Sequence, residues 1–443
     1  MSAPEALRTL ARTRARLWLL LLAAIAVLGG ALAVALATML PAFHFPNPGG
    51  PFGIGTLTYH WVDASRAEAF AADPKERRQL MVQIWYPAPP RLEPQPSERR
   101  AAYLPAADAE AVIRAFARIH DKPAWIFAAL KSDTTHAMPS VPVAADAGSY
   151  PVLLFLSGAT GFRQMNTFQV EHLVARGYVV VAIDQPGVAA AVVFPDGHQV
   201  VGMGLAQLRA SVGPSYLPGT TDRSPQAAWW PNGSALANKK LLAYLAADVT
   251  FTLDRLAALN LADPNGILAG RLDLQRLGAF GVSLGGIVVG ETCRVEARLR
   301  ACLMMDAPMS ADVVAAGLRQ PAMWLTRDAA TMRLERQRAG GWPEAEIEAH
   351  QGTMRRVYEG LQGAGYFVRV PGMFHANFTD VARWTPLAPL LGLAGPLDAQ
   401  RGHDIVNAYG LAFFDRHLSG RPAPLLEGPA AAYPEAVFES RRP

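Results

Sequence analysis

Short apolar runs alternate with amphipathic stretches from Tyr150 to the C-terminal part of the chain. The runs are five to seven residues long and nearly continuous, as in parallel strands that are buried on both faces. Alternation with helical segments predicts an α/β fold with a mostly parallel central sheet flanked by helices. The predicted strands are Pro151–Leu156, Tyr178–Ile183, Leu277–Val282, Leu299–Met305, Pro321–Thr326 and Tyr366–Val370.

Helical periodicity occupies the stretches between and after these strands. The predicted helices are Phe168–Arg176, Ala237–Leu259, Gly285–Ala297, Pro343–Leu361 and His403–Leu418.

The chain before Tyr150 has a different pattern. Ile54–Val62 and Gln79–Tyr86 are rich in β-branched and aromatic residues and are separated by a charged stretch, which predicts an antiparallel start to the sheet. The Pro-rich segment Pro87–Arg100 is typical of a surface loop, and Ala106–Ala129 has the pattern of a helix.

Residues Ala191 to Asn238 fit no crossover helix and contain Trp229, Trp230 and several Gly and Pro residues. We expect this segment to pass over the edge of the sheet where ligands bind in α/β folds. Arg383–Gly402 is a second long loop, with Trp384 and several leucines. The two loops suggest an apolar acyl or lipid site, and ordinary packing explains their composition equally well.

Leu17–Leu40 contains 24 residues without a charge. As a helix this segment would be about 36 Å long, enough to cross a bilayer core of about 30 Å. Arginines precede it and prolines follow it, so the positive-inside rule predicts a transmembrane anchor with an exported, periplasmic or extracellular catalytic domain. The alternative is a cleavable signal peptide and secretion, since Ala33-Val34-Ala35 and Ala35-Leu36-Ala37 resemble cleavage sites.

The formal net charge of +4 is concentrated in the N-terminal tail, because four arginines and one glutamate give +3 within the first sixteen residues. The nearly neutral remainder argues against nucleic-acid binding. The expected organisation is a basic tail at 1–16, the membrane or signal segment at 17–40, one catalytic domain at 41–425 and a C-terminal tail at 426–443. The sequence leaves the oligomeric state open.

Cys293 and Cys302 are the only cysteines. An exported location would permit a disulfide between them, and two buried unpaired thiols are an equally good prediction. Two cysteines are too few for a zinc site of their own, and no metal or cofactor is expected.

Gly281-Val282-Ser283-Leu284-Gly285 matches the G-x-S-x-G pattern of a nucleophile elbow. The pattern stands between a predicted strand and a predicted helix, where the turn of an α/β-hydrolase fold presents its serine. Glycines suit this turn because the backbone is strained and strand and helix approach closely. Ser283 is therefore the candidate nucleophile.

A serine nucleophile needs a histidine base, which follows the serine and the acid in the chain order of this fold. His350 and His403 lie in predicted helices, and His417 is explained as a charge at a helix end. His375 follows a predicted strand and a Pro-Gly turn, which is the loop position expected for the base.

Two aspartates are candidates for the acid that orients His375. Asp306 and Asp328 each follow a predicted strand, and strand position alone does not choose between them. Asp328 has an ordinary explanation as a partner of the neighbouring Arg327. Asp184 precedes the serine and fits the order poorly.

The oxyanion of a tetrahedral intermediate needs two backbone N–H donors. The residue after the nucleophile, Leu284, is the expected first donor. The small-residue loop Ser157–Gly161 follows the first central strand and offers Ala159 as the second, although an ordinary turn would have a similar composition.

Residues 45 to 420 resemble the plasma-type platelet-activating factor acetylhydrolase family, including its bacterial esterase relatives. The segments that carry the resemblance are Gly50-Pro51-Phe52, Gly55-Thr56, Trp61, Arg78–Pro87, Ser157–Gly161, Gly281–Gly286, Met305–Met309 and Phe374–Asp380.

The resemblance implies a calcium-independent serine hydrolase for esters with short or modified acyl groups, among them platelet-activating-factor-like lipids. It places the acid at Asp306, the base at His375 and the oxyanion donors at Leu284 and Ala159. The chain departs from the family at Val282 and Ser157, where the family often has His, and the second departure bears on the oxyanion loop. The alternatives are a polyester or dienelactone-type hydrolase and a non-catalytic, membrane-tethered binding protein on a hydrolase fold.

Overall fold

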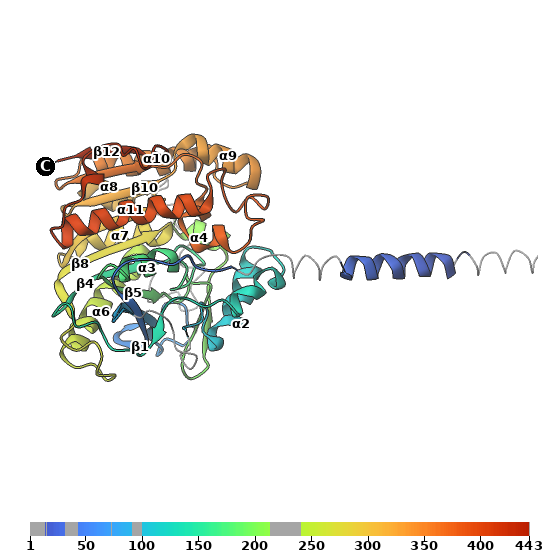
Figure 1. Cartoon of the computed structure of the whole chain (residues 1–443), viewed down its shortest axis with the longest axis horizontal. Coiled ribbons are helices and arrows are strands. Elements are labelled where there is room, and N and C mark those ends of the chain that lie inside the picture. The colour runs from blue at the N-terminus through green and yellow to red at the C-terminus, as the bar shows by residue number, and fades with distance from the viewer. Residues whose placement is uncertain are drawn as a thin grey trace, which may run out of the picture. The chain divides into compact units, whose positions relative to one another are not determined.

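The computed structural model describes residue 14 and residues 16–31, 43–71, 73–90, 100–212 and 241–442. The chain divides into two compact units, Met1–Ala42 and Phe43–Pro443. In the first unit, residues 16–31 form a helix (Figure 1). Its large apolar side chains, such as Leu20 and Val27, are exposed. No helix within the described ranges is long and apolar enough to cross a membrane. Only residues 17–31 of the predicted 17–40 span belong to those ranges.

Ten strands form one sheet in the described part of the second unit. Six neighbouring strands, in the order β11-β10-β9-β8-β4-β5, are parallel. Strand β12 is antiparallel to β11, and β2 is antiparallel to both β5 and β1. The short β3 pairs in parallel with β1. The strands are β1 (Gly53–Ala67), β2 (Arg77–Ala88), β3 (Met138–Pro139), β4 (Tyr150–Leu156), β5 (Val179–Asp184), β8 (Leu272–Val282), β9 (Leu299–Met305), β10 (Ala322–Thr326), β11 (Gly365–Arg369) and β12 (Val437–Arg441).

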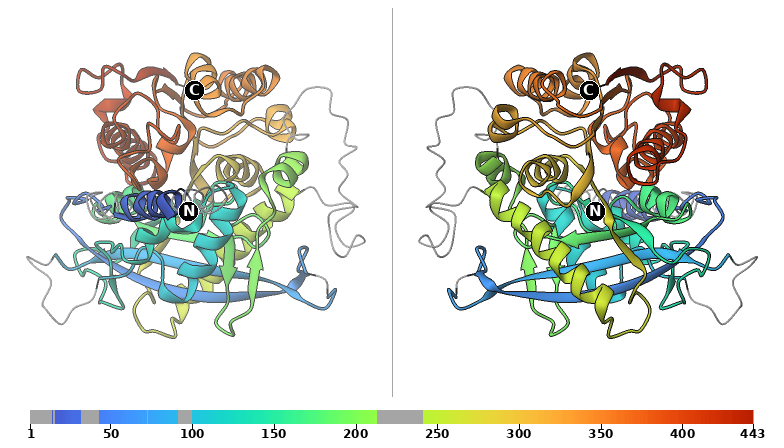
Figure 2. Two further views of the ribbon diagram at one scale, coloured as in Figure 1. Left: turned by 90° about the vertical axis from the view of Figure 1, so that its right-hand side faces the viewer. Right: turned by 90° about the vertical axis from the view of Figure 1, so that its left-hand side faces the viewer.

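Helices cover both faces of this sheet (Figure 2). One face packs against α6 (Leu241–Leu261), α7 (Leu284–Val295), α8 (Ala311–Ala316) and α10 (Glu344–Glu359). The other face packs against α3 (Thr167–Val174) and α11 (Ala399–Leu418). In β4, Val152 and Leu154 belong to the first apolar cluster and Leu153 and Phe155 to the second. Every β4 residue is buried, because the side chains alternate between two covered faces.

The remaining elements lie around the carboxyl ends of the strands or in the loops. They are α2 (Ala106–Ile119), η1 (Ala124–Lys131), β6 (Ala191–Val193), β7 (Gln199–Val201), α4 (Leu205–Val212), α9 (Ala329–Ala339), η3 (His375–Phe378), η4 (Asp380–Arg383) and η5 (Pro424–Leu426).

The eight predicted strands coincide with β1, β2, β4, β5, β8, β9, β10 and β11, and the prediction of an α/β fold with a mostly parallel sheet is confirmed. This architecture is consistent with an α/β-hydrolase.

Three segments differ from their predictions. The predicted helix Ala106–Ala129 is divided into α2 and η1, with Pro123 at the start of the second part. The segment predicted as a C-terminal tail contains β12, which pairs with β11 at the edge of the sheet. The excursion after Ala191 begins with the hairpin β6–β7 and with α4, whereas Trp229 and Trp230 lie outside the described residues.

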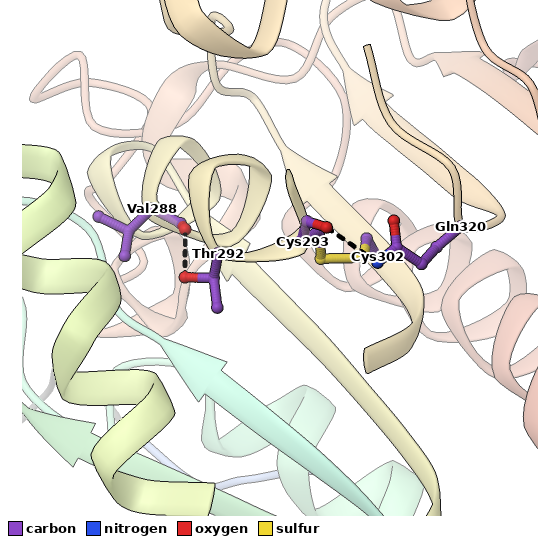
Figure 3. Close-up of a disulfide and its surroundings, with 5 residues drawn as sticks. All are labelled: Val288, Thr292, Cys293, Cys302 and Gln320. Atoms are coloured by element: carbon purple, nitrogen blue, oxygen red, sulfur yellow. Dashed lines mark hydrogen bonds between the residues drawn. A yellow bond between two sulfur atoms is a disulfide. The ribbon is translucent and has the colours of Figure 1, made fainter. Parts of the chain in front are cut away.

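Cys293 and Cys302 form a disulfide, so the alternative of two unpaired thiols does not hold (Figure 3). Cys293 is in α7, the helix that follows Ser283, and Cys302 is in the adjacent strand β9. Gln320 Nε2 donates a hydrogen bond to the carbonyl oxygen of Cys293 at 2.8 Å. The disulfide therefore ties the helix behind the elbow to the central sheet.

Candidate active site

Ser283 stands in the turn between β8 and α7, with φ 56° and ψ −124°. A non-glycine residue rarely adopts a positive φ, and such strain is typical of a nucleophile elbow. The N–H of Ser283 donates to the carbonyl oxygen of Met305 in the neighbouring strand at 2.9 Å, which holds the turn against the sheet.

The glycines around Ser283 allow strand and helix to approach each other. A Cβ atom on Gly281 would lie 2.5 Å from the Gly285 carbonyl carbon, and one on Gly285 would lie 2.1 Å from the carbonyl oxygen of Leu156. Real Cβ atoms do not come this close to backbone atoms, so neither position accepts a larger residue without movement of the backbone.

Asp306 and His375 meet at the carboxyl edge of the sheet. Asp306 directly follows β9 with φ 42°, and His375 begins η3 in the loop after β11. His375 Nδ1 lies 2.5 Å from Asp306 Oδ2. The structure thus brings Asp306 to the predicted base, whereas the carboxylate of Asp328 accepts the Thr331 N–H at 2.7 Å and caps α9.

Burial lowers the pKa of the His375 imidazole from its ordinary value, although the hydrogen bond and charge of Asp306 oppose this effect. Burial alone would raise the pKa of Asp306, but the positive charge of Arg327, with His350 and His375, holds it well below its ordinary value. The pair at neutral pH is therefore an ionised carboxylate and a neutral imidazole. In that state Nδ1–H donates to Asp306 and leaves Nε2 able to accept a proton.

Ser283 and His375 border the same two cavities. No hydrogen bond joins their side chains in the described part of the chain. Catalytic hydrogen bonds are often long before substrate binds, so the apo geometry is compatible with a nucleophile and its base.

Ala159 and Leu284, the predicted oxyanion donors, also border the larger cavity. In the loop after β4, the Thr160 N–H donates to Val188 O at 2.7 Å and the Gly161 N–H to Gly158 O at 3.0 Å. The Ala159 N–H has no acceptor among the described residues, and Leu284 is the first residue of α7, where an N–H lacks an intrahelical partner. Two backbone donors are therefore available near Ser283.

The two cavities differ in chemistry. The smaller, of about 240 Å³, is mostly apolar and is bordered by Phe116, Phe127 and Met165. The larger, of about 500 Å³, is bordered by charged groups, among them Arg209 and Glu346. An ester with its carbonyl at Ser283 could place one half in each cavity.

Two leucines of the loop Arg383–Gly402 line these cavities. Leu393 borders both cavities and Leu391 the smaller one, as expected for the second predicted loop. Trp384 instead packs behind the smaller cavity, with ring centroids 5.4 Å from Phe116 and 6.0 Å from Phe127. The aromatic walls from α2 and η1 were not predicted, because no local motif marks a residue that reaches a site from a distant helix.

Four residues around the acid were also missed as site residues: Arg327, Glu335, Trp342 and His350. Arg327 was predicted to pair with Asp328, but its Nε lies 3.0 Å from Asp306 Oδ2. The reason is that Arg327 and Asp306 follow neighbouring parallel strands, a proximity that sequence distance conceals. His350 was correctly predicted in a helix, yet its Nε2 lies 3.3 Å from Asp306 Oδ1.

Comparisons with known proteins agree with this geometry. No family model and no curated protein matches the chain. Among solved structures, a ferulic acid esterase from Streptomyces cinnamoneus is 28% identical with a TM-score of 0.65, over 90% of this chain and 99% of that chain. The similarity supports carboxylic-ester hydrolase activity. It also supports the α/β-hydrolase superfamily, but not the platelet-activating factor acetylhydrolase family in particular.

Proposed function

We propose that this chain is a serine esterase in which Ser283 attacks the ester carbonyl, His375 accepts the serine proton and Asp306 stabilises the resulting imidazolium. The observation that carries the proposal is the 2.5 Å contact between His375 Nδ1 and Asp306 Oδ2, at the wall of the cavities that Ser283 borders. This contact leaves Nε2 as the atom that takes the proton.

In the acylation step, a bond forms between Ser283 Oγ and the acyl carbon while the N–H groups of Ala159 and Leu284 donate to the oxyanion. The ester C–O bond then breaks, and the alcohol leaves with the proton held by His375. In deacylation, His375 takes a proton from water and the hydroxide adds to the acyl carbon. The bond between the acyl carbon and Ser283 Oγ then breaks, His375 returns the proton to Oγ, and the carboxylic acid leaves.

The smaller cavity favours a short apolar or aromatic acyl group. Aromatic rings of Phe116 and Phe127 border it, and among its described lining residues only His120 and Lys122, besides the base His375, have side chains that can carry a positive charge. The similar solved structure is named as a ferulic acid esterase, and ferulic acid has an aromatic acyl group. We therefore propose esters of aromatic acids as the preferred substrates. Short-acyl, platelet-activating-factor-like phospholipids are the second candidate, favoured by the order of motifs along the chain.

Substrate profiling of the purified catalytic unit tests both parts of the proposal. The panel contains p-nitrophenyl esters of increasing acyl length, methyl ferulate, a phospholipid with an acetyl group at its second position, and a polyester film. We expect turnover of methyl ferulate and of the shortest p-nitrophenyl esters, and loss of turnover and of fluorophosphonate labelling in Ser283→Ala. Labelling that persists in Ser283→Ala would remove the serine from the mechanism. A folded protein without any ester turnover would favour a binding protein instead.

We also propose that the first unit directs the catalytic unit out of the cytoplasm, as a membrane anchor or as a cleaved signal segment. The exposed apolar side chains of residues 16–31, with the preceding arginines, support this location. The Cys293–Cys302 disulfide is also typical of an oxidising compartment. Membrane fractionation and N-terminal sequencing of the mature protein distinguish the anchor from the cleaved segment, and a protein recovered intact in the cytosol would contradict both.

A further inference from the structure

The acid Asp306 has more partners than an orienting carboxylate needs. Its side chain is fully buried, and Oδ2 contacts both His375 Nδ1 at 2.5 Å and Arg327 Nε at 3.0 Å. The other oxygen, Oδ1, accepts the Thr326 hydroxyl at 3.0 Å and lies 3.3 Å from His350 Nε2. A buried arginine beside the acid destabilises the imidazolium that must form on His375, because the two positive charges repel each other. The presence of Arg327 at this position therefore needs an explanation.

Glu335, from α9, completes a closed path around the base. Its Oε2 forms an ion pair with Arg327 Nη1 and accepts the backbone N–H of His375 at 3.3 Å. Asp306 therefore holds the ring of His375 and Glu335 holds its main chain, while Arg327 joins the two carboxylates. We call these four residues, His375, Asp306, Arg327 and Glu335, the charge ring.

Three members of the charge ring, Asp306, Arg327 and Glu335, are shielded from water, whereas the His375 side chain is 27% exposed toward the cavities. The Arg327 side chain is fully buried and that of Glu335 is 10% exposed. The Trp342 indole lies against the Arg327 guanidinium, 4.7 Å from ring centroid to Cζ, and its ring is T-shaped to that of His375, with the two centroids 5.2 Å apart. Trp342 has φ 47° and follows Gly340 and Gly341, which also have positive φ. A strained turn thus presents an aromatic cover to the charge ring.

The charges explain how the fold tolerates the arginine. One guanidinium between two carboxylates carries one net negative charge, which is the charge of an isolated Asp306. When His375 gains the serine proton the charge ring becomes neutral, as an ordinary aspartate–histidine pair does. Removing either Arg327 or Glu335 would change this balance by one charge, in opposite directions.

We infer that Arg327 and Glu335 are positioning residues of this esterase, which fix His375 through its ring and its main chain and set the protonation of the base through opposite charges. The inference rests on the proposed function. Other ionisable groups also face His375 across the two cavities, and they stay unchanged in every variant of the test. They are His120, Lys122, Arg209, Glu346 and His350.

The test measures kcat/KM for p-nitrophenyl acetate against pH in Arg327→Gln and Glu335→Gln. Both variants are expected to lose 10- to 100-fold in kcat/KM at the optimum, about the effect of displacing a catalytic group. The acidic limb should move to higher pH in Arg327→Gln, by about one unit, because the lost cation no longer opposes the imidazolium. The acidic limb should move to lower pH in Glu335→Gln, because the lost carboxylate no longer stabilises the imidazolium. A purely structural role would not move the limb in opposite directions.

Two further variants keep the test decisive. Arg327→Lys preserves the charge but cannot bridge both carboxylates as a guanidinium does, so the limb should stay at the wild-type pH while kcat/KM stays reduced. Arg333→Gln removes an exposed cation of α9, the helix that carries Glu335; this cation pairs with Glu344, and its loss should leave the pH profile unchanged. Circular dichroism and fluorophosphonate titration give the folded, labelled fraction of each variant.

The inference would be overturned if the acidic limb of kcat/KM does not move in Arg327→Gln and Glu335→Gln, or if it moves in the same direction in both. If Arg327→Gln does not fold, Glu335→Gln and Arg327→Lys decide. The inference is supported if the acidic limb of kcat/KM moves to lower pH in Glu335→Gln and stays at the wild-type pH in Arg327→Lys. Any other pair of results overturns the inference. Wild-type protein without Ser283-dependent turnover would instead overturn the proposed function, so the two failures are distinguishable.

Discussion

Asp306→Asn is the substitution that tests the proposed mechanism most directly. The change keeps the shape of the side chain but removes the charge 2.5 Å from His375 Nδ1. A pair of charges about 4 Å apart at an effective dielectric constant of 20 interacts by about 4 kcal/mol. Because each 1.36 kcal/mol is tenfold in rate, we expect kcat to fall by roughly 10³-fold. An amide can also favour the wrong imidazole tautomer, which raises the expected loss toward 10⁴-fold.

The assay is steady-state hydrolysis of p-nitrophenyl acetate, with Asp328→Asn as the matched control. Asp328 caps α9, and asparagine is an equally good cap, so its rate and stability should stay close to those of the wild type. Asp306→Asn leaves the buried Arg327 with Glu335 as its remaining carboxylate partner, and loss of one buried ion-pair partner costs about 3–5 kcal/mol of stability. Rates are therefore normalised to folded protein. A large loss in Asp328→Asn with a small loss in Asp306→Asn would refute the assignment of the acid.

Three further outcomes follow from the geometry. The acidic limb of kcat/KM should lie below the ordinary histidine pKa of about 6.5, because burial lowers the pKa of His375 and activity requires the neutral imidazole; a limb above pH 7 in the pH profile would contradict this. Gly285→Ala should abolish turnover or folding, since its Cβ would lie 2.1 Å from Leu156 O, whereas Gly352→Ala, with open space around its Cβ, should be active; equal activity of both variants would refute the close approach. Phe116→Ala should raise KM for methyl ferulate more than for p-nitrophenyl acetate, and equal effects on both substrates would remove the smaller cavity as the acyl site.

The sheet could be predicted from the sequence because strands buried on both faces leave a strong local signal. The run Pro151–Leu156 has no polar residue, and all of β4 is buried between two helical layers. Edge strand β12 lacks that signal: Val437 is exposed and Glu439 pairs with Arg355 and Arg369. A strand with one neighbour and charged side chains resembles a polar tail in sequence, so its place in the sheet depends on tertiary pairing.

The candidate site shows the same division between local and distant information. Ser283 and His375 could be selected because the elbow motif and the turn after a strand are local patterns. Asp306 and Asp328 could not be distinguished from strand position, since both follow neighbouring parallel strands. Their difference lies in what each carboxylate meets: Asp306 meets His375 from a loop 69 residues away, and Asp328 meets the first turn of its own helix.

Arg327 illustrates how this division affects the chemistry. From sequence it is the neighbour of Asp328, and an exposed pair of that kind contributes little. In the structure its side chain is fully buried beside Asp306, where an unpaired cation would cost several kcal/mol. Asp306 and Glu335 both pair with Arg327, and Glu335 also accepts the backbone N–H of His375. Asp306 and Glu335 both contact His375. Substitutions that remove the buried charge of Arg327 or Glu335 should therefore shift the pH at which His375 acts as the base.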